Sequence, residues 1–137
     1  LTEASAARLD ELPADPVARL AGFIGNAVSP PVVDPRALSL WAASLQLVPR
    51  DTAMRAVHEA TYLAFRDRLE GMIADALQAA GKPATATRTR QLAIAGNALM
   101  DGLWIEASLL PELFEAGEMR IIAIHAFARL LDLNLPE

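Results

Sequence analysis

The sequence contains no cysteine and only two histidines, His58 and His125. The lack of cysteine excludes disulfides and thiolate metal sites, and two histidines are too few for a zinc or iron site without several added carboxylates. We therefore expect no metal and no cofactor. No apolar run approaches the ~18 residues that a membrane-spanning helix needs, and no basic and apolar leader opens the chain. These features predict a soluble, cytoplasmic protein without membrane contact.

Basic side chains are also few. The chain has 12 lysine and arginine residues against 17 aspartate and glutamate residues, which gives a formal net charge of −5. A chain with this charge balance does not hold nucleic acid by its own charge. Hydrophobic residues make up 53% of the 137 residues. This share excludes disorder through low hydrophobicity, and the length fits one domain with its own core.

Alanine is abundant, at 28 residues, and alanine favours helix. No segment alternates apolar and β-branched residues as a strand does. Prolines, glycines and capping aspartates divide the chain into segments with helical spacing. The predicted fold class is therefore all-α, a bundle of about six helices. Their expected ranges are 1–12, 17–28, 35–47, 52–80, 88–110 and 115–133.

The chain begins with Leu1 rather than methionine, and its first residues read as the end of a helix already under way. We therefore expect residues 1–12 to be the last part of a helix that begins upstream. Residues 13–137 are expected to form a single domain.

The segment 88–110 carries the most informative pattern. One side of it is an apolar stripe that includes Leu92, Leu99 and Leu103. Roughly opposite, Asn97, Asp101 and Trp104 fall within a narrow wedge of the helix. An exposed face rarely carries tryptophan, and a buried face rarely carries an unpaired aspartate, because an unpaired buried charge costs several kcal/mol. The wall of a partly polar cavity accounts for both residues. The alternative is that Asp101 pairs with an arginine and Trp104 belongs to the core.

The segment 115–133 is apolar around most of its circumference, which is more than one packed face requires. Such a helix needs a second partner besides its own core, and we expect that partner to be a second subunit. His125 falls on the polar side of this helix, where we expect it to be exposed or in a salt bridge. His58 lies on the inner face of the segment 52–80, as a hydrogen-bonded core histidine or as a ligand contact.

Motifs of the common enzyme classes do not occur. The sequence contains no phosphate-binding loop, dinucleotide fingerprint, zinc-protease motif or nucleophile elbow. Ser39, Ser44 and Ser108 have no histidine at a recognisable spacing. Because catalytic sites normally show a nucleophile, a base or a metal set, we predict that the chain is not an enzyme.

A family resemblance is carried by two stretches, LWAASLQLVPRDTAMRAVHEATYLAFRDRLEGMIADALQAAG and LAIAGNALMDGLWIEASL. Together they resemble the C-terminal ligand-binding and dimerisation domain of TetR/AcrR-family transcriptional regulators, in the BetI-like branch. In that branch a helix that starts with Leu-Trp precedes a long helix, and the next helix carries an Asp-Gly-Leu-Trp motif, here residues 101–104. The resemblance covers residues 16–134.

This resemblance implies an all-α domain of a transcriptional regulator, a repressor that a small-molecule effector releases from DNA. An N-terminal helix-turn-helix, missing from this chain, would read the DNA, and residues 1–12 would end the helix that joins the two domains. In the family the last two long helices pair with those of a second subunit, and the middle helices enclose the effector. The implied partners are therefore a second copy, an effector of unidentified chemistry, and DNA through the missing segment alone.

The resemblance also implies two sets of residues. Those around the effector are Phe23, Trp41, Leu45, His58, Tyr62, Phe65, Asn97, Asp101 and Trp104. Those in the dimer interface are Leu92, Leu99, Leu103, Ile121, Ile124, Phe127 and Leu131. A choline-like quaternary ammonium would find aromatic faces and a carboxylate in the first set, and a small lipophilic or aromatic ligand fits it equally well.

Two other classes stay open. The first is a helical module that only dimerises, in which case the wedge that contains Asp101 and Trp104 packs solid. The second is a small-molecule enzyme on a helical bundle. It requires a convergent base, acid or metal set around Asp101 and His58.

Overall fold

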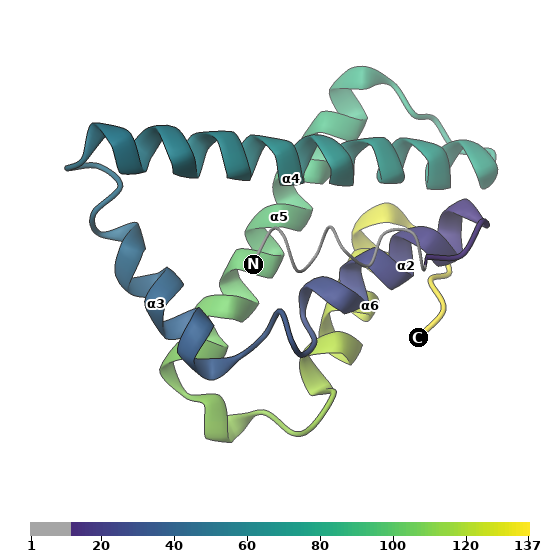
Figure 1. The fold of residues 1–137 in the computed structure, drawn as a ribbon. Helices are drawn as coiled ribbons and strands as arrows, with labels where there is room; N and C mark the ends of the chain where they lie inside the picture. The colour runs from purple at the N-terminus through teal and green to yellow at the C-terminus, as the bar shows by residue number, and fades with distance from the viewer. Residues whose placement is uncertain (1–11) are drawn as a thin grey trace.

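The computed structural model describes residues 12–137, which form five α-helices and one short 3₁₀ helix (Figure 1). The elements are α2 (Pro16–Ala27), α3 (Pro35–Leu45), α4 (Thr52–Ala79), α5 (Ala86–Leu109), η1 (Pro111–Leu113) and α6 (Glu118–Leu131). No strand occurs among these residues, so the all-α prediction is confirmed. The helix expected over residues 1–12 lies, apart from its last residue, outside the described part of the chain. None of the described helices is long and apolar enough to cross a membrane.

Capping residues set the starts of the first helices. The side chains of Asp15, Asp34 and Asp51 each accept a hydrogen bond from a backbone N–H of the following turn, at 2.8 to 3.1 Å. Such caps satisfy donors that have no partner within the helix and contribute about 1 kcal/mol each. Proline follows Asp15 and Asp34 at the first helical position, where its missing N–H costs nothing. These helices therefore begin where the sequence predicts.

The last helix is shorter than predicted at both ends. Gly117 before it has a φ of 81° and Asp132 after it has a φ of 53°, and both lie in the left-handed region. A left-handed residue ends the regular helical hydrogen-bonding pattern. Helix α6 therefore spans Glu118–Leu131 rather than residues 115–133.

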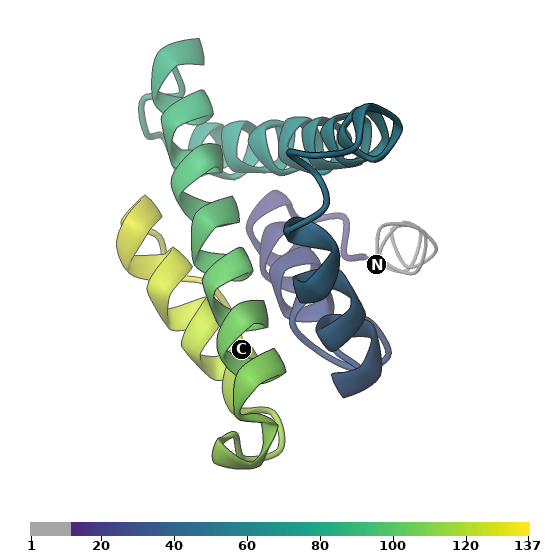
Figure 2. The same cartoon turned by 90° about the vertical axis from the view of Figure 1, so that its left-hand side faces the viewer.

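Helix α4 crosses over the other helices (Figures 1 and 2). Its buried residues all lie between Leu69 and Leu77, so its C-terminal half is the part that packs on the core. Helix α2 packs against α4 and α6, while α5 packs against α3, α4 and α6. The largest fully buried side chains come from all five α-helices and the loop after α2: Phe127, Leu20, Ile24, Leu38, Leu69, Ile73, Leu77, Met100, Ile124, Leu131 and Val32. Burying a side chain of this kind stabilises the fold by about 1.5–3 kcal/mol.

The side of α5 that faces the core carries small residues and Met100. The apolar stripe of leucines on this helix is only half buried. Ala93, Gly96 and Met100 are buried. A Cβ added at Gly96 would lie 2.5 Å from the ring of Phe127 on α6, so only glycine lets the two helices approach this closely. The leucines at 92, 99 and 103 pack against the core but are only half buried.

Three residues of α6 that the resemblance implies for the dimer interface belong to the core instead. Ile124, Phe127 and Leu131 have 0% of their surface exposed, because they form the face by which α6 packs on α2 and α5. They leave no surface for a second subunit, so this part of the expectation is wrong. The outward isoleucines of α6 are Ile121 and Ile122, which are 47% and 38% exposed.

The Gly96–Phe127 contact predicts that Gly96→Ala destabilises the fold, although alanine is the better helix former. At an open helical position the change from glycine to alanine stabilises by about 0.5–1 kcal/mol. Here the added Cβ would overlap the Phe127 ring, and relieving such overpacking costs about 1–3 kcal/mol. We expect a net loss of about 1 kcal/mol in the free energy of unfolding, measured in urea.

The matched control is Gly71→Ala on α4, where no heavy atom of the described residues lies within 4 Å of the added Cβ. This variant is expected to be slightly more stable than the parent protein. Stabilisation of equal size in both variants would contradict the close packing of α5 on α6.

Candidate ligand pocket

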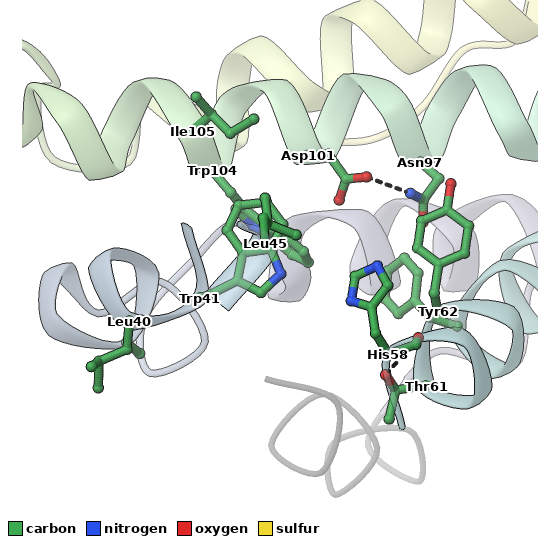
Figure 3. Close-up of a pocket in the computed structure, with 12 residues that line it drawn as sticks. Leu40, Trp41, Leu45, His58, Thr61, Tyr62, Asn97, Asp101, Trp104 and Ile105 are labelled. Carbon is green, nitrogen blue, oxygen red and sulfur yellow. Dashed lines mark hydrogen bonds between the residues drawn. The ribbon is translucent and has the colours of Figure 1, made fainter. Parts of the chain in front are cut away.

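Helix α3 and the N-terminal half of α4 diverge beside α5 (Figure 1). A pocket lies between these three helices. Both helices pack on α5 and have no substantial contact with each other. The cavity has a volume of about 480 Å³, and small-molecule sites typically measure about 300–1,000 Å³. Its lining is Ala37, Leu40, Trp41 and Leu45 of α3, His58, Thr61, Tyr62 and Phe65 of α4, and Asn97, Asp101, Trp104 and Ile105 of α5 (Figure 3).

Eight of the nine residues expected around an effector line this cavity. The exception is Phe23 of α2, which is buried in the core behind the wall and packs its ring against Phe65 at 5.2 Å between centroids. Phe23 therefore supports the pocket without reaching it. The structure thus brings the other eight together, and their role in binding a ligand stays a prediction.

Four lining residues were absent from the expected set. Thr61 shares the inner face of α4 with His58 and Phe65 at helical spacing, so periodicity was a signal for it. Leu40 is the neighbour in sequence of Trp41, which was expected in the lining. Nothing in the sequence distinguishes Ala37 and Ile105 from other apolar residues of their helices.

Aromatic rings from three helices pack on one another in the pocket wall. The rings of Trp41 and Trp104 meet edge to face, with centroids 5.5 Å apart and an interplanar angle of 84°. The ring of Phe65 is tilted against Trp104 at 6.4 Å. The indole Nε1 of Trp104 also donates a hydrogen bond to the carbonyl of Ala27 at 3.0 Å. Trp104 is therefore a core residue and a pocket residue at once, which combines the two alternatives that the sequence left open.

Asp101 lies partly buried on the α5 wall. The amide of Asn97, one turn earlier, donates from Nδ2 to Oδ2 of Asp101 at 2.8 Å. Within residues 12–137 the ion pairs join Lys82 to Asp132 and His125 to Glu137. Asp101 thus has no arginine partner in this part of the chain, and the arginine alternative is not found there. His125 is exposed, as predicted, and its Nε2 lies 3.0 Å from Oε1 of Glu137.

Burial raises the pKa of the Asp101 carboxyl to about 6, because the charged form loses hydration in the pocket. The positive charge that His58 can carry lowers this pKa, and so does the hydrogen bond from Asn97. Figure 3 shows the side chains of His58 and Asp101 pointing toward one another from α4 and α5. His58 is half buried and its ring stacks on Tyr62 at 5.9 Å, so it is a pocket residue rather than a core histidine.

The fold recurs in known proteins. Residues 16–132 match the family described as the C-terminal domain of BetI-type transcriptional repressors, a TetR-type C-terminal family. The chain belongs to this family. The resemblance noted in the sequence is thereby confirmed, and the family is one of transcriptional regulators rather than of enzymes.

A solved structure shares the fold of this BetI-type domain. It is described as that of a transcriptional regulator from Pseudomonas aeruginosa PAO1, and it matches with a TM-score of 0.83 and 27% sequence identity over 96% of this chain. The match covers 62% of that protein's chain, so the domain spans less than two thirds of its length. No curated protein shows a significant match.

Asp101→Asn is expected to stabilise the BetI-type domain at neutral pH and to lose this effect in acid. A carboxyl whose pKa is raised on folding costs stability above its folded pKa of about 6, and the cost vanishes below its unfolded pKa of about 4. Because solvent screens the partly exposed group, we expect a gain of about 1 kcal/mol near pH 8. Urea unfolding near pH 8 and near pH 4 measures it.

The control for this experiment is Asp67→Asn, which removes an exposed carboxylate from α4. It is expected to change stability little at either pH. If Asp101→Asn stabilised the domain equally at both pH values, desolvation of the carboxylate would not be the cause.

Proposed function

We propose that this chain is the effector-binding and dimerisation domain of a transcriptional repressor that a small-molecule ligand releases from DNA. The observation that carries the proposal is the cavity of about 480 Å³ among α3, α4 and α5. A module that only dimerises needs no such cavity, and its wedge would pack solid. Asn97, Asp101 and Trp104 instead line open space.

The proposed mechanism is linkage between the pocket and DNA-reading segments outside this chain. A ligand that touches both α3 and α4 favours one relative arrangement of two helices that barely contact each other. Helix α3 is the wall that moves at lowest cost, since Leu38 is its only buried residue. A dimer binds two half-sites ~34 Å apart, so a small change in spacing weakens binding. A coupling of ~1–3 kcal/mol is enough for a switch. The regulator would act in the cytoplasm.

The second part of the proposal is a homodimer formed through the outer face of α5 and the adjacent face of α6. This outer face is exposed and consists of small and apolar residues at spacings of three and four: Ala95, Ala98, Gly102, Ile105 and Leu109. On α6, Ile121 and Ile122 are exposed as well, and on α5 the half-buried Leu92, Leu99 and Leu103 border the outer face. Small residues permit close approach of two helices, and contiguous exposed apolar surface is typical of interfaces.

Filling the pocket from α3 tests the effector site. Ala37→Phe adds a ring at a lining position, and Ala43→Phe adds the same ring at an exposed position of the same helix. Nile red, a neutral apolar dye, is expected to bind the parent protein saturably. Because the new ring occupies the cavity, Ala37→Phe is expected to weaken dye binding about tenfold, which is about 1.4 kcal/mol. Fluorescence titration measures the affinity.

The Ala43→Phe variant is expected to bind the dye as the parent does. Unsaturable binding to the parent, or equal loss in both variants, would show that this cavity does not accept small molecules. Circular dichroism of each variant establishes that the helices remain folded.

Gly102→Leu tests the dimer. A Cβ added at Gly102 would have no heavy atom of the described residues within 4 Å, so a larger side chain meets no obstacle in this part of the subunit. Leucine also favours helix over glycine by roughly 0.8 kcal/mol. A second copy packed on this face would nevertheless be pushed away. We expect the parent to be a dimer and Gly102→Leu to be a folded monomer, by light scattering after size exclusion.

Gly71→Leu is the matched control, because it adds the same side chain to an open position on α4. It is expected to stay dimeric. A parent that is monomeric at high concentration, or a dimeric Gly102→Leu variant, would rule out this face of α5 as the interface.

A further inference from the structure

The pocket has a polar end and an apolar end (Figure 3). Asp101 and Asn97 of α5 lie at the polar end, opposite His58 and Tyr62 of α4. The other end is formed by Leu40, Trp41, Leu45, Trp104 and Ile105. Because apolar surface gains by leaving water and polar groups need partners, this division suits an elongated ligand with one polar head and an apolar body.

Among residues 12–137, the polar end carries a negative charge without a fixed positive partner. Asp101 receives a hydrogen bond from the neutral amide of Asn97, and no lysine or arginine of this part of the chain lines the pocket. The hydroxyl of Thr61 donates to carbonyls of its own helix at 3.0 and 3.1 Å, so it offers no donor to a guest. A neutral guest leaves the carboxylate unpaired and an anion is repelled by it. A cation removes the cost of the buried charge.

The aromatic rings favour an N–H-bearing cation over a quaternary ammonium. A quaternary ammonium needs ring faces arranged around one point. Here Trp41 and Trp104 pack edge to face on each other, and Phe65 is tilted against Trp104. The rings of Trp41 and Trp104 belong to the apolar end, away from the carboxylate (Figure 3). An ammonium with N–H groups instead forms charge-assisted hydrogen bonds with a carboxylate directly.

We propose that the ligand of this pocket is a protonated primary or secondary amine with an elongated apolar group. Its N–H groups donate to the carboxylate of Asp101, and its apolar group lies against Trp41 and Trp104. The inference rests on the proposed function of the pocket as an effector site, and it departs from the choline-like ligand considered above.

The two tryptophans provide the readout. Trp41 and Trp104 are the only tryptophans in the chain and both line the pocket, so intrinsic fluorescence reports its occupancy directly. Three probes share one apolar body and differ in the head: 4-phenylbutylamine, its trimethylammonium derivative and 4-phenylbutanol. We expect the amine to bind at least about tenfold more tightly than the other two near pH 8, since a charge-assisted hydrogen bond is stronger than a neutral one.

Asp101→Asn keeps the size of the side chain and removes its charge, so it is expected to abolish the preference for the amine. The matched control is Glu106→Gln, which removes an exposed carboxylate from the same helix outside the lining. This variant is expected to keep the preference of the parent.

Acid is a second readout. Within the described part of the chain, the titratable groups that face the cavity are His58 and Tyr62 of α4 and Asp101 of α5, and α3 contributes none to the lining. Burial raises the pKa of the Asp101 carboxyl to about 6, so lowering the pH to 5 neutralises most of the carboxylate and removes the partner of a cationic head. The affinity for the amine is therefore expected to fall at least about tenfold between pH 8 and pH 5, while the affinity for the alcohol stays constant.

Each contrary result has its own meaning. If the alcohol or the trimethylammonium probe binds as tightly as the amine, or if Asp101→Asn keeps the preference, the amine class is wrong and the effector pocket stands. The same holds if no probe binds while Nile red still does. If neither the probes nor Nile red bind, the proposed effector site fails together with this inference.

Discussion

The side chain of Trp104 is the point at which the pocket and the core are joined. Its indole Nε1 donates to the carbonyl of Ala27, the last residue of α2, at 3.0 Å. Carbonyls at the end of a helix have no hydrogen-bond partner within the helix. Ala27 is 1% exposed, so the bond from Trp104 gives its carbonyl a partner where water does not reach. The ring of the same residue contacts Trp41 and Phe65. One side chain of α5 thus fixes α2 and also orders the walls supplied by α3 and α4.

Helix α5 has three functional faces because it carries different residue sizes on different sides. Gly96 on the core face admits the ring of Phe127, and Asp101 faces the pocket. Gly102 lies on the exposed face that we propose for the dimer. Pocket and proposed interface therefore lie on neighbouring sides of one rigid element, and Ile105 belongs to both. A ligand that displaces α5 would move both surfaces together.

Much of this arrangement could be predicted from local chemistry. Asp15, Asp34 and Asp51 mark the helix starts because a short acidic side chain satisfies the first turn. The family resemblance indicated most of the pocket, and helical spacing independently places Asn97, Asp101 and Trp104 on one face. Periodicity could not show that Phe23 lies behind the pocket wall, because the spacing of apolar residues does not tell a residue that lines a cavity from one buried behind it. The interface residues expected on α6 were wrong for another reason. When apolar residues surround a helix, the sequence pattern does not distinguish its inward side from its outward side. On α6 the inward side holds Phe127 and the outward side holds Ile121.

The two halves of α4 differ in how tightly they pack against the rest of the domain. Its C-terminal half buries Leu69, Ile73 and Leu77 completely, whereas residues 52–64 are exposed apart from the half-buried His58 and Tyr62. The well-packed half anchors the helix, so its other half can line a cavity without unfolding the domain. Helix α3 faces it with a single buried residue, Leu38. Both walls thus lack contacts that a ligand would provide, and the ligand stabilises whichever arrangement gives it the most contact. The loose packing around the pocket is therefore what would allow binding there to change the shape of the domain.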